Sequence, residues 1–377
     1  LDHLNDDGFL TIVAHHRPEV YKLVSIAFKV LMDQGLGAQE IKQRIVAVEG
    51  AGHHSGLPVL ILKKTPFTNR QTALIYEKSN ELAFTPIYIP NVNDTYFDPL
   101  LNHLANDRIS IDQAISLAPY DITAPTDDNP FFYKFEKNMP NTLSQLLIGT
   151  ITLSGLVFGI YIVAWSRRLA LASKKQLHSF VRSFSLFRPY YFASLGLGFM
   201  LIEIPLTQRF ILFLGHPTLA IAVTLFSLLL ASGLGSFYST RWSNRKLYDF
   251  YKVSLAVGAT LVLYLFALPP IFSAYLSYDS TFRFFMAFGL IFPLGFLMGI
   301  PFPTGLRLIK KELNNEAAWM WCINGAFSVL GAVLALAIAM SYSFSAVLLL
   351  GGLIYIGIFL VGRTWANAEI EGAEREE

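Results

Sequence analysis

The sequence has very little cysteine and little charge. Its one cysteine, Cys322, excludes an internal disulfide, and no C-x-x-C pair is present for a metal or redox site. Charged residues make up only 15% of the 377 positions while 53% are hydrophobic, which excludes a disordered protein, a coiled coil and a disulfide-stapled scaffold. The aromatic content of 14%, which includes 31 Phe, suits side chains that face lipid or pack between apolar helices. We therefore interpret the chain as a membrane protein.

The start of the sequence also lacks familiar features. LDHLNDDGFL holds no methionine and no basic segment followed by an apolar one, so we expect the chain to begin in the middle of a fold. Residues 1–143 carry 12 Lys and Arg against 17 Asp and Glu, a net charge of −5, whereas residues 144–377 carry 17 against 10, a net charge of +7. This asymmetry predicts two different modules that join near residues 136–145.

The second module, residues 144–363, contains apolar segments of about the 20 residues that a helix needs to cross a bilayer. We count seven, which are 145–165, 190–214, 217–238, 253–275, 284–306, 320–341 and 344–362. They predict an all-α polytopic bundle of about seven transmembrane helices. The helix-breaking sequence PFP at 301–303 predicts a break in the fifth segment. Residues 364–377 are acidic without apolar periodicity, and we expect them to be disordered.

The loops between these segments differ in charge. Residues 166–189 hold six basic residues and no acid, and the stretches around 239–252 and 307–315 are also basic. Because cytoplasmic loops retain positive charge, the three basic stretches predict one cytoplasmic face. An odd number of crossings then places residues 1–143 on the other side. The protein is expected in a cell membrane, plasma or inner, with the lipid bilayer as a partner.

The first module alternates strand and helix patterns. Residues 8–14 form a short apolar run rich in β-branched side chains, and residues 18–34 have apolar positions at helical spacing between Pro18 and Gly35. RIVAVEG and LPVLILKK flank a glycine-rich turn and predict a hairpin, followed by a helix over 69–82 and a strand over 84–90. This is the pattern of the last third of an α/β sheet protein that ends in an antiparallel hairpin.

Several strings together resemble those of one family, the multi-pass membrane proteins that carry a spermidine synthase-like domain of the class I methyltransferase fold. In residues 1–143 they are LNDDGFLTIVA, ILKKTPFT and PTDDNPFFYKF. In the apolar half they are GLGFMLIEIPLTQRFILFLGHP, LFSLLLASGLGSFYS, PLGFLMGIPFPTGLRL and AWMWCINGAFSVLGAVLA. The resemblance implies that residues 1–143 are the α/β C-terminal part of a Rossmann-like domain, beginning at its fifth strand.

The resemblance also implies an activity, transfer of an aminopropyl or methyl group, with a polyamine or another small molecule as substrate. In that fold a glycine-rich turn after the first strand holds S-adenosylmethionine or its decarboxylated form, with acids near the second and fourth strands. This chain holds none of those strands, so we expect it to bind no cofactor by itself. The upstream part of the same protein is then a required partner, and no nucleic acid is expected.

The strongest local signal in the apolar half is a pair of opposite charges. Glu203 and Arg209 lie in one predicted span, where an unpaired charge costs several kcal/mol, so an ionisable group there predicts a functional site. They lie on different helix faces, but a kink at Pro205 would let them pair. His216 and Asn324 could complete the intramembrane polar site. The alternatives are a structural ion pair, or an Arg209 that snorkels to the membrane surface.

Two polar pairs in the first module are further candidates. His15 and His16 follow a strand at the edge where open α/β sheets bind ligands, but a polar loop start is the favoured explanation because adjacent side chains at a strand end point to opposite faces. Asp127 and Asp128 precede Asn129-Pro130 and could bind a polyamine or cation, or could cap backbone NH groups in a turn. His53 and His54 suit a solvated turn. Adjacent histidines without a third ligand make no metal site, and none is predicted.

Two glycine pairs, Gly155 with Gly159 and Gly295 with Gly299, have the G-x-x-x-G spacing that marks close helix contacts. Two functions follow from the whole sequence. One is an integral membrane protein with a spermidine synthase-like domain whose cofactor-binding half is absent from this chain. The alternative is a membrane carrier, or a protein that handles lipids or small molecules, with a polar site around Glu203 and Arg209.

Overall fold

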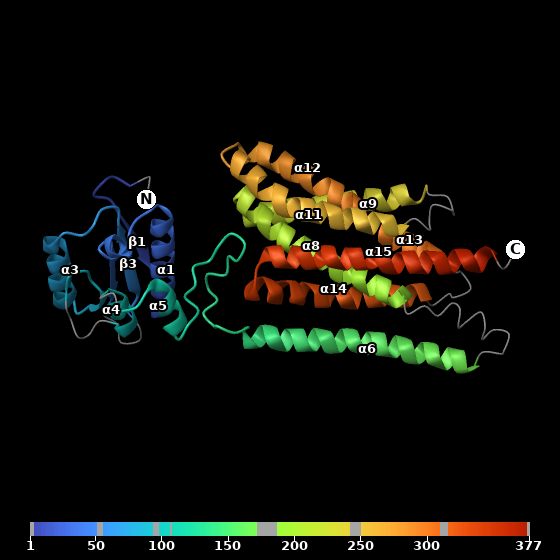
Figure 1. The fold of residues 1–377 in the computed structure, drawn as a ribbon, viewed down its shortest axis with the longest axis horizontal. Coiled ribbons are helices and arrows are strands. Elements are labelled where there is room, and N and C mark those ends of the chain that lie inside the picture. The colour runs from blue at the N-terminus through green and yellow to red at the C-terminus, as the bar shows by residue number, and fades with distance from the viewer. Residues whose placement is uncertain are drawn as a thin grey trace. The chain divides into compact units, whose positions relative to one another are not determined.

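The structure is a computed structural model that describes residues 4–50, 56–92, 98–105, 108–171, 187–241, 250–309 and 316–374. The chain divides into two compact units (Figure 1). The sheet unit comprises Leu1–Thr126 and Pro130–Asn138, and the helical unit comprises Asp127–Asn129 and Met139–Glu377. The predicted boundary near residue 143 is thus close to the observed one, except that three residues of the first module belong to the helical unit.

The sheet unit is a small α/β structure. Its elements are β1 (Phe9–Val13), α1 (Arg17–Asp33), α2 (Ala38–Lys42), β2 (Ile45–Glu49), β3 (Pro58–Lys63), α3 (Asn69–Glu81), β4 (Thr85–Tyr88), α4 (Pro99–Ala105) and α5 (Ile111–Leu117). Each predicted strand and helix is confirmed, with the β2–β3 hairpin in the register Ile45↔Leu62 to Glu49↔Pro58. The strand order is β1-β3-β2-β4, and all three neighbouring pairs are antiparallel. The described residues contain no parallel neighbours, so a Rossmann-like sheet stays a prediction.

Sequence signals explain where these helices begin and end. α1 starts beside Pro18, whose fixed φ suits a first helical turn, and ends before Gly35, whose φ of +88° only glycine adopts easily. α3 begins with a capping box, in which Thr68 accepts from the backbone of Gln71 and the Gln71 side chain accepts from the backbone of Thr68. The proline and the glycine are the signals from which the sequence predicted α1, and the capping box explains why α3 starts at Asn69.

Helices cover both faces of the sheet. One core joins α1, α4 and α5 to one face, with Phe28, Leu60 and Leu101 among its buried residues, and a smaller one joins Val46, Phe67 and Ile89 on the opposite face. β1 is different. It is an edge strand paired only with β3, and its Phe9 and Val13 side chains remain 61% and 58% exposed.

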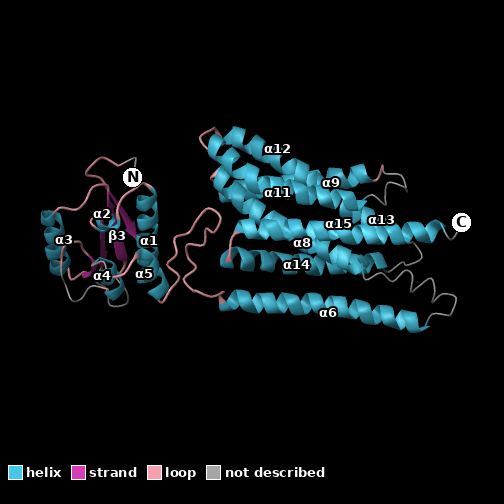
Figure 2. Ribbon diagram, in the orientation of Figure 1, coloured by secondary structure: helices cyan, strands magenta, loops and turns pink. Residues whose placement is uncertain are grey.

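The helical unit consists of long apolar helices (Figure 2). They are α6 (Asn141–Leu171), α8 (Phe187–Leu214), α9 (Pro217–Ser239), α11 (Phe250–Tyr275), α12 (Ser280–Met298), α13 (Pro301–Leu308), α14 (Glu316–Ser341) and α15 (Phe344–Glu374). Within the described ranges, six segments are long and apolar enough to cross a membrane, with α12 and α13 counted as one, and Phe344–Leu360 of α15 is a shorter apolar helix. The chain therefore has the architecture of a multi-pass membrane protein. The predicted break at PFP is confirmed, because α12 stops at Met298 and α13 starts at Pro301.

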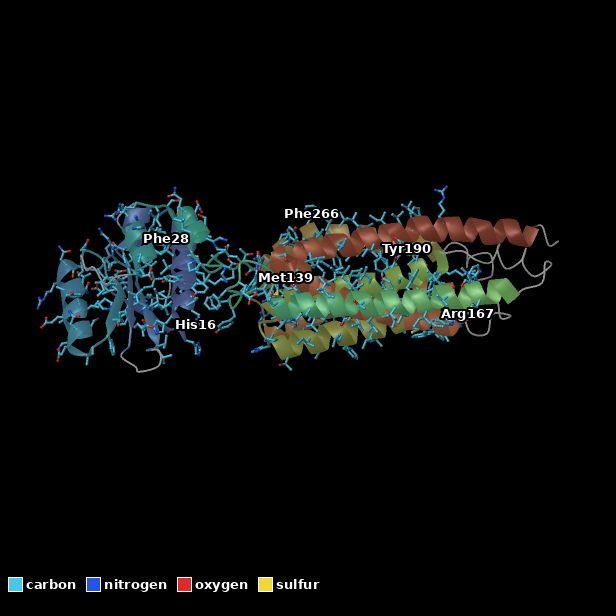
Figure 3. All side chains as sticks on the ribbon, turned by 90° about the horizontal axis from the view of Figure 1, so that it is seen from below. His16, Phe28, Met139, Arg167, Tyr190 and Phe266 are labelled. Carbon is cyan, nitrogen blue, oxygen red and sulfur yellow. The ribbon has the colours of Figure 1, made fainter. Side chains whose placement is uncertain are left out.

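Apolar side chains cover the outside of this unit. Phe266, labelled in Figure 3, is 76% exposed, and Phe226 and Leu263 are 57% and 61% exposed. A water-soluble bundle would hold polar residues at such positions, whereas lipid solvates apolar ones. The outward Phe side chains thus agree with the aromatic-rich composition.

The two glycine pairs differ in the structure. A Cβ at Gly299 would overlap the Ser232 carbonyl oxygen, and one at Gly295 would lie 3.0 Å from the Ala231 Cβ, so α12 and α9 are in the close contact that the sequence predicted. A Cβ at Gly155 or Gly159 would meet nothing within 4 Å, so that pair marks no helix contact among the described residues. The acidic tail also differs from expectation, because α15 continues as helix to Glu374 through residues predicted to be disordered.

Candidate functional site

The candidate site is a cavity of about 390 Å³ in the helical unit. It lies at the end of the bundle where α8 leads into α9 and α14 into α15, which we call the turn end. α8, α11, α15 and the segment 127–129 build it, through Asp127, Asp128, Arg209, Leu212, Phe213, Leu265, Pro269, Phe272, Ser273, Leu276 and Ser345. The cavity thus combines charged and apolar walls.

Arg209 is the charge in the wall that α8 supplies. It lies five residues before the helix ends at Leu214, or ~8 Å along the axis, and its side chain is only 11% exposed. Its Nη2 donates to Ser345 Oγ at 2.6 Å and to Asp128 Oδ1 at 3.3 Å. Since a charge this far inside a span must be paired or hydrated, these two acceptors explain how the bundle holds it.

Asp128 joins the segment 127–129 to the start of α15. Its Oδ1 accepts from the Ser345 backbone N–H at 3.0 Å, and its carbonyl oxygen accepts from the Phe344 N–H at 2.9 Å. Asn129 Nδ2 adds a hydrogen bond to the Tyr342 carbonyl oxygen at 3.0 Å. A carboxylate at the first turn of a helix satisfies free N–H groups and interacts favourably with the helix dipole. Asp128 therefore caps α15 and pairs with Arg209.

Two of the charged residues in the cavity have polar groups without a partner among the described residues. Both hydrogen bonds that Arg209 makes to described residues come from Nη2, so Nη1 remains for a further acceptor. Asp127 is exposed and has no ion-pair partner among the residues that the structure describes. The cavity lining therefore holds one further donor group and one further carboxylate, at a formal charge of −1 from Asp127, Asp128 and Arg209.

The apolar wall contains two aromatic side chains, Phe213 and Phe272, beside aliphatic ones. Phe213 and Phe272 stack with ring centroids 4.5 Å apart and an interplanar angle of 15°, and Phe210 meets Phe272 edge-on at 5.1 Å. Leu212 and Leu265 extend the wall. A pocket with such a wall and a few convergent polar groups is the usual form of a small-molecule site.

The structure separates the four residues predicted to share an intramembrane polar site. Glu203 is half-buried, eleven residues before the end of α8, and has no ion-pair partner within the described ranges. Asn324 donates to the Phe192 carbonyl oxygen at 3.0 Å, in another part of α8. His216 is exposed at the N-cap of α9 and makes no capping bond. Arg209 alone of the four lies in the cavity, and its partner is Asp128 and not Glu203.

The predicted residues of the first module are also separated. His15 and His16 are exposed at the start of α1, with Nδ1 atoms 3.6 and 3.4 Å from the Glu19 carboxylate. Asp127 and Asp128, in contrast, belong to the helical unit. His53 and His54 lie outside the described residues. Across the part of the chain that is described, no group of three or more His, Cys, Asp or Glu side chains could hold a metal ion.

The end of the sheet unit near His15 and His16 holds a charged cluster that the sequence did not indicate. Arg17 Nη2 lies 2.6 Å from Glu49 Oε2, and this hydrogen bond raises the Arg17 pKa. The Tyr21 hydroxyl donates to Asp98, and burial together with this bond raises the Tyr21 pKa. Each group is satisfied within the unit, so we read the cluster as structural.

Sequence reasoning missed a buried ion pair in the helical unit. Arg188 Nη1 lies 3.1 and 3.2 Å from the two Glu316 carboxylate oxygens, with the residues 1% and 8% exposed. The sequence assigned Arg188 to a basic loop, although its place before Pro189 at the head of an apolar run was the available signal. The pair joins the first turns of α8 and α14.

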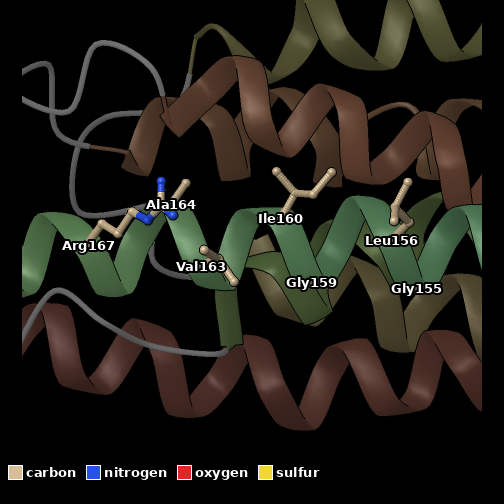
Figure 4. A pocket seen from close by; sticks show the side chains of 7 residues that line it. All are labelled: Gly155, Leu156, Gly159, Ile160, Val163, Ala164 and Arg167. Atoms are coloured by element: carbon tan, nitrogen blue, oxygen red, sulfur yellow. The ribbon is translucent and has the colours of Figure 1, made fainter.

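A second hollow, of about 520 Å³, lies along α6 (Figure 4). All seven residues that line it come from α6 itself, including Gly155, Gly159 and Arg167. It is a groove between side chains of one helix, where the two glycines leave space. With no second element and one charge at its end, it offers no convergent polar groups.

Comparisons with known proteins identify no relative whose function could be compared with this site. No protein-family model, no curated protein and no solved structure matches the chain. The resemblance to spermidine synthase-like membrane proteins therefore stays a prediction, and the cavity is the strongest indication of function.

Proposed function

We propose that the protein is a membrane carrier or lipid-handling protein that binds an amphipathic small molecule or lipid in the cavity around Arg209. One observation carries the proposal: an ion pair between the largely buried Arg209 and the partly exposed Asp128 shares a cavity of about 390 Å³ with an apolar wall. Ionisable residues are rare within membrane spans, and where they occur they commonly mark the pathway of a ligand or an ion. The volume is within the usual 300–1,000 Å³ of ligand sites.

Binding at this site can be measured with the purified full chain. Arg209→Gln should lower the amount of lipid or other small molecule that stays bound through detergent exchange, as quantified by native mass spectrometry. Arg241→Gln is the matched control, because Arg241 is exposed at the other end of α9 and its described contact is with the Phe237 ring. Equal retention by the two variants and the unchanged protein would rule out the cavity as the binding site.

A second function is supported by the sheet unit. β1 and β2 both run antiparallel to β3, which lies between them, and β1 leaves Phe9 and Val13 exposed at an edge where further strands could cover them. This is the arrangement expected of the C-terminal part of a spermidine synthase-like or methyltransferase-fold domain. The membrane helices would then anchor an aminopropyl- or methyltransferase in the plasma or inner membrane.

The transferase proposal has a direct test. S-adenosylmethionine and its decarboxylated form are titrated calorimetrically into the protein that the complete gene encodes. Saturable binding of either supports the transferase. Absence of binding removes it and leaves the cavity in the helical unit as the functional centre.

A further inference from the structure

We infer that the ligand of the cavity is a zwitterionic phospholipid with a primary amine, such as phosphatidylethanolamine. This rests on the proposed function, because it names the ligand class of the same site. The first step concerns charge. Asp127, Asp128 and Arg209 together carry a formal charge of −1, so a ligand with only negative charge would be repelled by the net charge of the lining.

A ligand with only positive charge is disfavoured by Arg209. Its side chain is 11% exposed and depends on Asp128, 3.3 Å away, for its counter-charge. A cation that took Asp128 from it would leave a buried guanidinium without its partner, which is costly. A ligand that brings one charge of each sign avoids both penalties.

The spare groups of the cavity match those two charges. Arg209 can offer Nη1 to a phosphate oxygen while Nη2 stays with Asp128 and Ser345. Asp127, exposed and without an ion-pair partner among the described residues, can accept from an ammonium group. A primary amine donates three hydrogen bonds, whereas the quaternary ammonium of phosphatidylcholine donates none.

The apolar wall and the place of the cavity favour a lipid over a water-soluble zwitterion. Phe213, Phe272 and Leu265 give the cavity an apolar surface beside its charged groups. The cavity lies at the turn end, between the ends of apolar helices, where headgroups meet a bilayer's hydrocarbon. A phosphate and an amine joined to apolar chains therefore suit a lining that has both charged and apolar side chains.

The test measures binding of single phospholipids to the purified full chain by native mass spectrometry. Phosphatidylethanolamine should bind about tenfold more tightly than phosphatidylglycerol or phosphatidylcholine, the size of effect of one charge-assisted hydrogen bond. Asp127→Asn should abolish this preference, while Arg209→Gln should weaken every phospholipid. Asp279→Asn is the control, an exposed carboxylate at the same end but outside the cavity lining.

The outcomes separate the two proposals. If Arg209→Gln weakens binding but phosphatidylglycerol binds as well as phosphatidylethanolamine, the zwitterion inference is overturned and the cavity remains a lipid site. If soluble phosphoethanolamine competes as strongly as the lipid, the lipid source is overturned. If Arg209→Gln changes nothing, the proposed function itself fails. Should that variant not fold, Asp127→Asn, a change at an exposed side chain, still decides the inference.

Discussion

At the scale of single residues, Asp128 carries two roles that would usually need two side chains. One carboxylate oxygen, Oδ1, accepts from the Ser345 backbone N–H and also faces Arg209. The carboxylate therefore stabilises the start of α15 and the charge on α8 together. Loss of Asp128 should destabilise both helices. Loss of Arg209 should leave the capping role of the carboxylate intact.

Arg209 and Asp128 should be energetically coupled. We expect Asp128→Asn and Arg209→Gln each to lower the free energy of unfolding by about 1–3 kcal/mol, because each leaves a partly buried polar group without its partner. The double variant should lose less than the sum of the two losses. Unfolding in detergent of the two single variants and the double variant measures the coupling.

The same cycle with Glu203 is the internal comparison. The sequence suggested Glu203 as the partner of Arg209, but the structure pairs Arg209 with Asp128. Glu203→Gln and Arg209→Gln should therefore be additive within about 0.5 kcal/mol. Strong coupling between them would instead restore the kinked Glu203–Arg209 pair.

Asp121 should make the sheet unit sensitive to acid. Burial alone would raise its pKa, but hydrogen bonds from Thr123 and the charges of Lys22 and Lys134 outweigh burial and lower the pKa below its ordinary value. The folded state then binds fewer protons than the unfolded state, so this stabilisation is present above the unfolded pKa and is lost as pH falls through the folded pKa.

Asp121→Asn removes this pH dependence. The variant should be less stable than the unchanged protein by roughly 1 kcal/mol at neutral pH, and the difference should shrink below about pH 4. Hydrogen exchange of residues 121–135, corrected for the intrinsic rate at each pH, reports the difference. A gap that stays constant down to about pH 2 would contradict the assigned pKa direction.

At the scale of elements, glycine decides how closely the helices of the bundle approach. A Cβ at Gly235 of α9 would overlap the Phe296 carbonyl oxygen of α12, and one at Gly196 of α8 would overlap the Asn324 carbonyl oxygen of α14. The same residue type on α6, at Gly155 and Gly159, meets no neighbour. Glycine spacing in the sequence therefore has different consequences on different helices.

Gly235→Ala and Gly159→Ala form a matched pair that tests this difference. Both glycines are within long helices, where alanine is intrinsically preferred by up to about 1 kcal/mol. We expect Gly235→Ala to destabilise the bundle by about 1–3 kcal/mol through overpacking, and Gly159→Ala to be neutral or slightly stabilising. Thermal unfolding in detergent compares them, and equal effects would deny a close α9–α12 contact.

The Arg188–Glu316 pair should hold α8 and α14 together at their first turns. Glu316→Gln leaves the Arg188 charge buried, which we expect to cost about 3–5 kcal/mol. Replacement of both residues by Met should cost less than Glu316→Gln alone, because no charge is then left unpaired. Detergent unfolding measures both variants, and a cost under about 1 kcal/mol for Glu316→Gln would indicate that water reaches the pair.

At the scale of the whole molecule, the two ends of the helical unit differ in charge. Among the described residues, one end holds Arg167, Arg188, Arg241 and Arg307 with Glu316, and the turn end holds Asp127, Asp128 and Asp279 with Arg209 and Arg283. The positive-inside rule predicts that the basic end is cytoplasmic and that the turn end is on the opposite side.

Cysteine labelling in intact cells or vesicles checks this orientation. In a variant without Cys322, Arg241→Cys should react with a membrane-impermeant thiol reagent only from the cytoplasmic side, and Tyr278→Cys only from the opposite side. Both positions are exposed at helix ends. Labelling of both positions from the same side would contradict an odd number of membrane crossings between residues 241 and 278.

The sequence by itself determined the two modules, the four strands and two longest helices of the first, the long apolar helices of the second and the break at Pro301. These features depend on runs, periodicity and turn residues that are local in the chain, so they can be read without a structure. Only the tertiary structure decided which residues form the site. Arg209 meets Asp128, 81 positions earlier, and Ser345, 136 positions later, because helix packing brings α8, α15 and the segment 127–129 together. No local pattern encodes those pairings. For the same reason, the prediction that Arg209 pairs with Glu203, which is close to it in the sequence, was wrong.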